Sequence, residues 1–352
     1  MKIIAIELLE KYYQNNKEIS LFGKWITFNN IKDLLKKYDT FFEVSQIGTS
    51  ENGNPILQLK IGTGKKKILI WSQMHGNEST GTKALFDVLN CFLQNNTNEF
   101  STIVKECTLI FIPMLNPDGA QAYTRVNANN IDLNRDAVDR LAKESTILRN
   151  VLETFKPKFC FNLHDQRTIF GVEGTKNTAT ISFLAPSEEE TRAITEGRKQ
   201  TMNVIVAMNT LLQQIIPGNV GRYTDEFYPT ATGDNFQKLG YNTILIESGH
   251  YSNDYNREES RKFTFYSMVQ GLYHIATTSN FNTYKAYFDI PNNKELFFDV
   301  IHRYTDAKND KAYQYVDKII ENKLVATLVE IEQTSLKDKI GHCEIVFDSL
   351  KN

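Results

Sequence analysis

Compact apolar segments alternate with amphipathic helical segments along this chain, and the alternation constrains its fold more than any other feature. The apolar segments, typical of strands buried on both faces, lie at residues 67–72, 108–113, 158–163, 180–184 and 242–246. Helical spacing of apolar residues separates them, at residues 80–92, 137–155, 188–215 and 258–276. This alternation predicts an α/β fold whose mixed, largely parallel central sheet is flanked by helices.

The segments before this region predict two short helices and a two-stranded hairpin, at residues 3–13, 31–38, 42–47 and 56–61. Asn29 and Asn30 are the candidate caps of the second short helix. Ser187 and Glu190 have the spacing of a capping box, which predicts that the long helix starts at residue 188.

The pattern changes after residue 284, where an Asp-Ile-Pro-Asn-Asn segment interrupts the alternation. We therefore divide the chain into a main domain, residues 1–284, and a small α+β appendage, residues 285–352. Within the appendage, residues 316–320 are predicted to be helical. Residues 326–331 and 343–347 are predicted to form a terminal pair of strands.

Composition narrows the classes of partner and compartment. The chain has 352 residues, a formal net charge of −2 and no long basic run, which argues against nucleic acid or an anionic membrane as a partner. No apolar stretch is long enough to span a bilayer, and the apolar start is too short for a signal peptide. Cys91, Cys107, Cys160 and Cys343 lie apart in apolar segments, which predicts buried free thiols. We expect a cytoplasmic protein and leave its oligomeric state open.

Polar residues follow two of the predicted strands in a pattern typical of a metal site. His75 and Glu78 come just after the strand at 67–72, and His164 follows the strand at 158–163. Ligands tend to gather at the carboxyl ends of strands in such a sheet, so these side chains can reach a common point. Two imidazoles and one carboxylate form a zinc set with an open position, where a bound water ionises near neutral pH. We therefore predict one Zn²⁺ per chain.

Several short segments, read together, resemble the zinc carboxypeptidase family across residues 30–280. They keep the order found in that family: residues 48–56, the His-Gly-Asn-Glu segment 75–78, the Asn-Pro-Asp-Gly segment 116–119, Arg125, the Asp-Leu-Asn-Arg segment 132–135, His164 and Glu247. The resemblance implies that His75, Glu78 and His164 are zinc ligands, which is also the ligand set of carboxypeptidase A.

The resemblance implies further roles in the reaction. Asp132 would orient the imidazole of His75, as carboxylates commonly do behind metal-bound histidines. Arg125 would stabilise the oxyanion that develops on the substrate carbonyl. Glu247 would act as the general base, and partial burial at the end of its strand would raise its pKa toward the working range.

The remaining roles concern the substrate. Asn134 and Arg135 resemble the pair that grips the terminal carboxylate, for which a guanidinium offers a bidentate fork. A mobile tyrosine covers the substrate in this family, and Tyr228 is our first choice for it, with Tyr223 as the alternative. Asp234, if it lies at the floor of the side-chain pocket, would favour a basic C-terminal residue.

The resulting prediction is a metallocarboxypeptidase that hydrolyses the C-terminal peptide bond by attack of zinc-bound water, with Glu247 as the base. Its partner would be a peptide or small amide with a free carboxylate, and peptides derived from peptidoglycan are one variant. The alternative is a zinc amidohydrolase of small N-acyl amino acids, because the aspartoacylase and succinylglutamate desuccinylase group shares the His-Gly-Asn-Glu and Asp-Leu-Asn-Arg segments. A catalytically silent binding protein on the same scaffold is a third interpretation.

Overall fold

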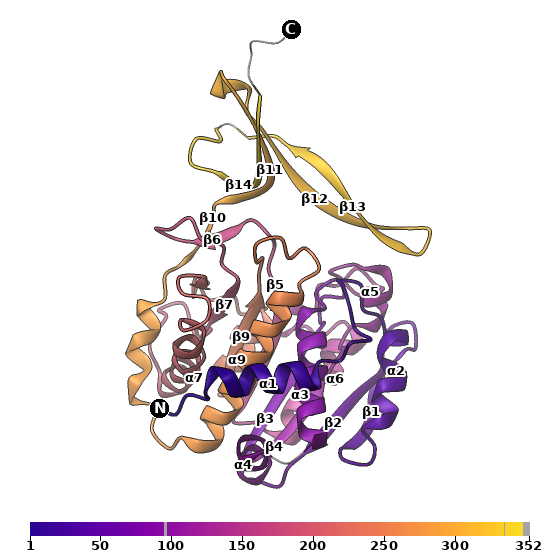
Figure 1. The fold of residues 1–352 in the computed structure, drawn as a ribbon. Helices are drawn as coiled ribbons and strands as arrows, with labels where there is room; N and C mark the ends of the chain where they lie inside the picture. Colours follow the sequence, from indigo (N-terminus) through magenta and orange to yellow (C-terminus); the bar gives the residue numbers. More distant parts are fainter. Residues whose placement is uncertain (95–96, 334, 348–352) are drawn as a thin grey trace.

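The computed structural model of the protein describes residues 1–94, 97–333 and 335–347 (Figure 1). An eight-stranded sheet forms its centre, in the spatial order β1 (Glu43–Thr49), β2 (Pro55–Ile61), β4 (Cys107–Ile112), β3 (Lys66–Trp71), β5 (Phe159–Asp165), β9 (Asn242–Ser248), β7 (Ile181–Leu184) and β8 (Val220–Arg222). The central strands β4, β3, β5 and β9 run parallel. Antiparallel pairing adds β2 and β1 on one side and β7 on the other. The predicted mixed, largely parallel sheet is confirmed.

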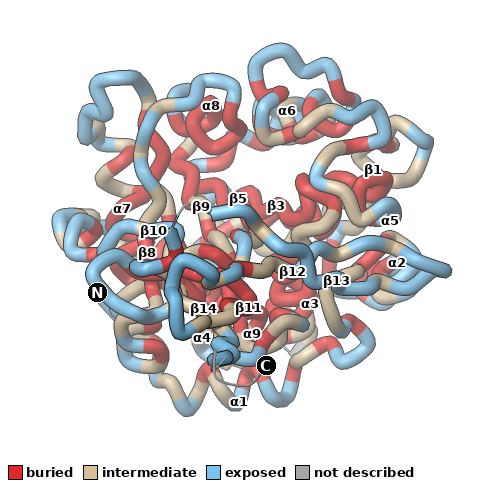
Figure 2. The backbone as a smooth tube through the Cα atoms, turned by 90° about the horizontal axis from the view of Figure 1, so that it is seen from above, coloured by how far each residue is buried: buried red, intermediate tan, exposed pale blue. Residues whose placement is uncertain are grey.

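Helices cover both faces of this sheet. Successive residues of its strands point to opposite faces, so each face has apolar side chains that pack against helices. Ile68 and Ile70 of β3 pack into the larger apolar core, whereas Leu69 and Trp71 pack into a second core. The larger core includes residues of α1 (Ile6–Asn16), α2 (Phe28–Lys37), α3 (Thr80–Gln94), α4 (Asn98–Glu106), α7 (Glu196–Leu212) and α9 (Glu258–Thr277). The second core includes residues of α6 (Lys143–Phe155) and α8 (Thr232–Lys238). Figure 2 shows β3, β5 and β9 buried in the middle of the molecule.

Two helices begin with caps other than those predicted. The long helix starts at Glu196, later than expected, and Ser187 lies in the preceding loop, where its hydroxyl donates to the carbonyl of Asp225. Thr195 caps this helix instead through its side-chain oxygen. In α2 the cap is Thr27, and Asn30 completes a capping box with it.

The C-terminal part forms a separate four-stranded sheet, in the order β13 (Lys323–Ile331), β12 (Lys311–Ile320), β11 (Phe297–Tyr304) and β14 (Ile340–Phe347). The helix predicted at residues 316–320 is wrong, because these residues belong to β12 and pair continuously with β13. Their β-branched side chains favour such an extended hairpin. The strands predicted at 326–331 and 343–347 are present, but they lie on opposite edges of the sheet and do not pair with each other.

This small sheet stands over the carboxyl end of β5 and is reached through a short connection (Figure 1). The chain leaves α9 through the turns of η2 (Asn282–Asp289) and then adds β10 (Asn293–Glu295) to β6 (Phe170–Val172). A further turn, η3 (Ala307–Asn309), joins β11 to β12. The connection therefore places the small sheet beside the strand end that carries His164.

Polar contacts also hold the small sheet against the loops that precede α2 and α9. Lys24 forms an ion pair with Asp317, and the Tyr255 hydroxyl donates a 3.1 Å hydrogen bond to Asp299. The division of the chain at residue 285 remains a proposal: Tyr287 packs in the larger core. The small sheet has its own apolar cluster of Phe298, Ile301, Ala312 and Leu336.

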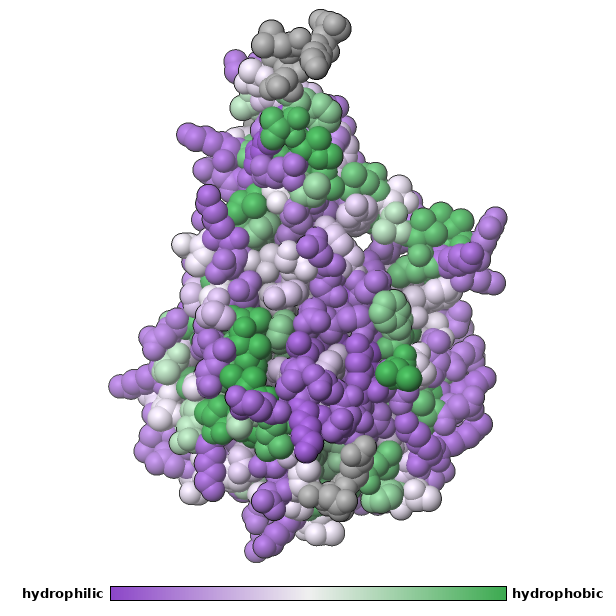
Figure 3. Space-filling view, in the orientation of Figure 1, coloured by the Kyte–Doolittle hydropathy of each residue, from purple (hydrophilic) through white to green (hydrophobic). Residues whose placement is uncertain are grey.

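The small sheet leaves much of its surface in solvent, because few other elements cover it. Figure 3 shows hydrophobic side chains on its outside, where Val316, Ile320 and Val346 are exposed. Cys343 is also exposed, so the prediction of a buried thiol is wrong there, whereas the other three cysteines are free and buried as predicted. Among the helices that the structure describes, none is both long and apolar enough to cross a membrane.

Candidate metal centre and substrate cleft

The three predicted metal ligands converge. His75 and Glu78 lie on the loop between β3 and α3, and His164 lies near the end of the neighbouring strand β5. Glu78 Oε1 is 2.8 Å from His75 Nδ1, and Glu78 Oε2 is 2.8 Å from His164 Nδ1. One ligand atom from each residue lies within 4.8 Å of the other two, and the described part of the chain holds no second group of this kind.

The chemistry of this donor set fits a divalent cation. Asp132 Oδ1 lies 3.0 Å from His75 Nε2, which favours the tautomer that keeps the proton there and turns an unprotonated Nδ1 toward Glu78. The Nδ1 atoms of His75 and His164 are only 3.1 Å apart. Burial alone would raise the pKa of Glu78, but protonated imidazoles on both sides would lower it well below its ordinary value. Electron pairs brought this close together repel one another unless positive charge lies among them.

Asp132 links the cluster to Arg125. The same Asp132 Oδ1 accepts a 2.9 Å hydrogen bond from the backbone N–H of Asn134 and so caps η1 (Leu133–Arg135). Asp132 Oδ2 accepts from Arg125 Nε at 2.9 Å, and Arg125 Nη1 donates to Glu78 Oε1 at 3.3 Å. The Arg125 side chain remains 46% exposed, which leaves part of the guanidinium available to a substrate beside the cluster.

A cleft of about 470 Å³ opens beside the three ligands and is lined by both Asn134 and Arg135. Asn134 Oδ1 accepts a 3.1 Å hydrogen bond from the backbone of Thr232, which fixes the side-chain amide. Arg135 donates one 2.8 Å hydrogen bond to the Asn134 carbonyl and is otherwise exposed. The cleft therefore contains a positive, planar group as well as the three ligand candidates.

Glu247 lies directly across from His164, because β5 and β9 pair in parallel with these two residues in register. It lines the cleft and is partly exposed to it. Among the described residues, none forms a hydrogen bond or ion pair with the Glu247 carboxylate, whereas Glu78 pairs with His164. Burial, and then the negative charges of Glu78 and Asp165, raise the pKa of Glu247 well above its ordinary value. The Glu247 carboxylate therefore accepts a proton more readily than an exposed glutamate does.

Both candidate tyrosines line the cleft, in different surroundings. Tyr228 is 50% exposed, and its hydroxyl donates a 2.8 Å hydrogen bond to Glu226. Tyr223 is less exposed and packs edge-on against Phe170. The backbone N–H of Tyr228 donates to Asp234, which is buried in α8 and lines the cleft, and burial raises the pKa of Asp234 to about 6.

Asn162 is a cleft residue to which the sequence analysis assigned no role. It is 1% exposed, lines the cleft, and leaves both polar atoms of its side chain without a partner. Buried amides are normally hydrogen-bonded, so an unpaired one at a cleft is suited to contact a ligand. The available signal was a polar residue inside an apolar strand, two positions before His164 and therefore on the same face.

Glycine and capping interactions position the ligand loop. A Cβ on Gly76 would lie 1.9 Å from the Gly119 carbonyl carbon, at the start of α5 (Pro117–Ala122), so no larger residue fits between the two loops. Asp165 Oδ2 accepts from the backbone N–H of Thr80 at 3.1 Å and from its hydroxyl at 2.7 Å, at the first residue of α3. Asp165, the neighbour of His164, is thus hydrogen-bonded to the first residue of α3, and Gly76, the neighbour of His75, packs against α5.

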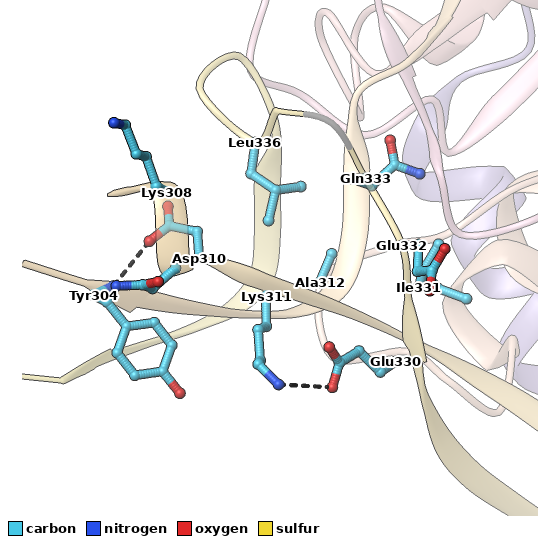
Figure 4. A pocket seen from close by; sticks show the side chains of 11 residues that line it. Tyr304, Lys308, Asp310, Lys311, Ala312, Glu330, Ile331, Glu332, Gln333 and Leu336 are labelled. Atoms are coloured by element: carbon cyan, nitrogen blue, oxygen red, sulfur yellow. Dashed lines mark hydrogen bonds and ion pairs between the residues drawn. The ribbon is translucent and has the colours of Figure 1, made fainter. Parts of the chain in front are cut away.

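A larger hollow, of about 900 Å³, lies on the small C-terminal sheet and has none of this chemistry (Figure 4). Three of its charged groups already have partners: Lys311 pairs with Glu330 at 3.1 Å, and Asp310 accepts from the backbone of Tyr304 at 2.8 Å. None of the three metal-ligand candidates lines it. Size alone therefore does not identify the site in this molecule.

Known proteins resemble this chain in sequence and in fold. Residues 28–300 match the zinc carboxypeptidase family. Carboxypeptidase SOL1 of Arabidopsis thaliana is 32% identical over 182 residues, which is 46% of this chain and 37% of that protein. Gamma-D-glutamyl-L-diamino acid endopeptidase 1 of Lysinibacillus sphaericus is 34% identical over 98 residues, 26% of this chain and 24% of that protein. This chain thus spans well under half the length of these curated relatives.

Two solved structures share the fold. The metallo-carboxypeptidase from Burkholderia cenocepacia has a TM-score of 0.56 at 18% identity, over 72% of this chain and 70% of that chain. Carboxypeptidase A from Helicoverpa armigera has a TM-score of 0.58 at 15% identity, over 78% of this chain and 81% of that chain.

Proposed function

Because the chain belongs to the zinc carboxypeptidase family, we propose that it is a zinc-dependent metallocarboxypeptidase that hydrolyses the C-terminal peptide bond of its substrates. The observation that carries this proposal is the convergence of His75, Glu78 and His164 beside a cleft that also holds Arg135. A reducing, cytoplasmic location is part of the proposal and is supported by the free thiols.

His75, Glu78 and His164 would hold the zinc ion, and Asp132 would keep the His75 ring in the tautomer that a ligand needs. When bound, zinc would polarise the scissile carbonyl and make a water acidic enough to react near neutral pH. Arg125 would donate to the carbonyl oxygen as negative charge develops there, because its guanidinium already reaches Glu78.

Arg135 and Asn134 would bind the terminal carboxylate of the substrate and so select the last peptide bond. A planar guanidinium binds a carboxylate through two parallel hydrogen bonds, which fixes orientation as well as position. Tyr228 would cover the bound residue, since it stands exposed at the mouth of the same cleft. Tyr223 stays the alternative for this role.

Glu247 would act as general base. Its position opposite His164 supports this role, as does a raised pKa that brings the carboxyl closer to the working range of a base at neutral pH. The carboxylate would accept a proton from the attacking water and pass it to the nitrogen of the departing amino acid.

The side-chain preference would be set by Asp234 and Asn162. Asp234 supports a preference for a basic C-terminal residue, and Asn162 adds an unpaired donor and an unpaired acceptor to the same cleft. Peptides that end in Lys, Phe or Glu would be compared by kcat/KM. Equal or faster turnover of the Phe peptide would contradict the basic preference.

A panel of peptides and N-acyl amino acids, assayed with and without a chelator, tests the proposed function. We expect release of the C-terminal residue from peptides, loss of activity with the chelator and recovery with Zn²⁺. Faster hydrolysis of N-acyl amino acids would favour the amidohydrolase alternative. No hydrolysis by the zinc-loaded protein would favour a silent binding protein.

A further inference from the structure

A second pocket, of about 310 Å³, adjoins the cleft at the metal cluster. The two share Glu78 and Arg125, together with residues 165–167. Arg135 lines only the first pocket, whereas Asp317 and other residues of the small C-terminal sheet line only the second. The metal-ligand candidates therefore lie between the cleft that contains Arg135 and a second pocket that is lined by the small sheet.

The second pocket has an excess of unpaired hydrogen-bond acceptors. Four buried side-chain oxygens among its lining residues have no partner: Asn77 Oδ1, Asp165 Oδ1, Gln314 Oε1 and Asp317 Oδ1. They come from the ligand loop, from the end of β5 and from β12. Each of these residues is itself partly exposed and lines the pocket.

The positive side chains of the same pocket are already engaged. Arg257 donates to the carbonyl oxygens of Ser248 and Gln166, at 3.0 and 2.8 Å. Lys24 pairs with Asp317, Arg125 is held by Asp132 and Glu78, and the largely exposed Arg167 pairs with Glu295 at 3.4 Å. The pocket therefore lacks donors rather than acceptors, and a ligand that carries several N–H donors would supply them.

We propose that this pocket binds a protonated amine of the substrate, upstream of the scissile bond. The inference rests on the proposed function, which places the terminal carboxylate at Arg135 and the scissile bond at the cluster. The preceding part of the substrate then enters the second pocket, where residues of β12 line the wall. The α-ammonium of a short peptide meets these requirements, and a lysine side chain in a longer peptide offers the same chemistry.

Binding measurements on zinc-loaded Glu247→Gln protein test the pocket without turnover. The ligands are an Ala-Ala-X tripeptide with a free amino terminus, its N-acetyl form, and acetyl-Lys-Ala-X, where X is the C-terminal residue preferred in the assays above. We expect the free tripeptide to bind roughly tenfold or more tightly than its acetyl form, as charge-assisted hydrogen bonds predict. Tight binding of acetyl-Lys-Ala-X would identify a side-chain amine as the source instead.

Variants of the pocket should shift this preference in opposite directions. Asp317→Asn removes the negative charge and should reduce the ratio of the two dissociation constants toward one. Gln314→Glu adds a negative charge and should raise the ratio. Lys24→Met breaks the same ion pair as Asp317→Asn but frees the carboxylate, so it should raise the ratio as well. If the ion pair had only a structural role, Asp317→Asn and Lys24→Met would change the ratio of dissociation constants in the same direction. Glu330→Gln, in the same hairpin but outside the pocket, is the matched control.

Equal binding of all three ligands, or a ratio unchanged by Asp317→Asn and Gln314→Glu, would overturn the inference. Hydrolysis by the parent protein is measured separately. If no peptide is cleaved, the proposed function fails, while binding to the Glu247→Gln protein still decides whether the pocket takes an amine.

Discussion

The carboxylates of Glu78 and Glu247 lie in one cleft but in different surroundings. Glu78 is held between two imidazoles, whereas Glu247 is partly buried and faces other negative charges. The first environment favours a permanently ionised ligand, and the second favours a group that can take up a proton. Their proposed roles, metal ligand and base, follow from this difference.

Replacing Glu247 by Gln should reduce kcat by a factor of about 10² to 10⁴, the usual contribution of a general base. KM and zinc content should change little, because Glu247 is not one of the three metal-ligand candidates. Steady-state kinetics with metal analysis would check this, with exposed Glu189→Gln as the control. Unchanged turnover would remove Glu247 from the mechanism.

Replacing Arg135 by Gln should lower kcat/KM roughly 10- to 100-fold for substrates with a free terminal carboxylate, since a charge-assisted contact is lost. The exposed Arg140→Gln variant is the control. A peptide with an amidated terminus should be a poor substrate for parent and variant alike. An equal effect of Arg135→Gln on both kinds of peptide would indicate general damage to the cleft.

The spacing and order of His75, Glu78 and His164 predicted that these side chains converge, and the structure brings them together. No role was predicted for Asn162, since one polar residue in a strand is equally compatible with a hydrogen-bonded core position. Only the packed structure reveals that this amide has no partner.

The loop between β3 and α3 contacts α5 more closely than any side chain would allow. Replacing Gly76 by Ala would put a methyl group into the backbone of Gly119, so the ligand loop or α5 must move. We expect unfolding free energy to fall by about 1–3 kcal/mol, the usual range for overpacking, and zinc affinity to fall with it. Denaturant unfolding and zinc titration would measure both, and a variant with parental values would contradict the tight contact.

Strands were predicted more accurately than helix starts. Apolar runs define the buried strands directly, whereas a helix start depends on which polar side chain is free to cap it. The helix predicted from residue 137 begins at Lys143, because Asp136 already accepts hydrogen bonds from the backbone of Leu141 and Ala142 and holds a loop there. Such competing contacts are not visible in local sequence.

Acid should destabilise the whole molecule partly through buried histidines. His274 is 2% exposed, and burial lowers its pKa to about 4 from an ordinary value near 6.5. As the pH falls below 6.5, His274 becomes protonated in the unfolded chain but stays neutral in the native state. The free energy of unfolding therefore decreases until about pH 4. The loss amounts to at most about 3 kcal/mol.

Urea unfolding of the parent protein and of His274→Gln at several pH values would test this. The variant should show a shallower loss of stability between pH 6.5 and 4, whatever its stability at pH 7. His302→Gln, on the small sheet, is the control. Identical pH dependence in the parent and His274→Gln would show that this histidine does not contribute.

The placement of the small sheet over the metal cluster could not be predicted from sequence. It depends on contacts between distant residues, such as Lys24 with Asp317 and Tyr255 with Asp299. Local patterns revealed strands in this region but neither their order nor their partner surface. The pocket between the two sheets was therefore invisible until the chain was seen folded.

The register of β5 and β9 has a consequence for how relatives of this protein can diverge. His164 and Glu247 project from neighbouring strands whose spacing of about 4.8 Å is common to all sheets. The backbone hydrogen bonds between the two strands therefore set the separation of these residues, and the surrounding loops have little influence on it. Insertions and substitutions in those loops can therefore change which substrate binds without changing the positions of His164 and Glu247 relative to each other.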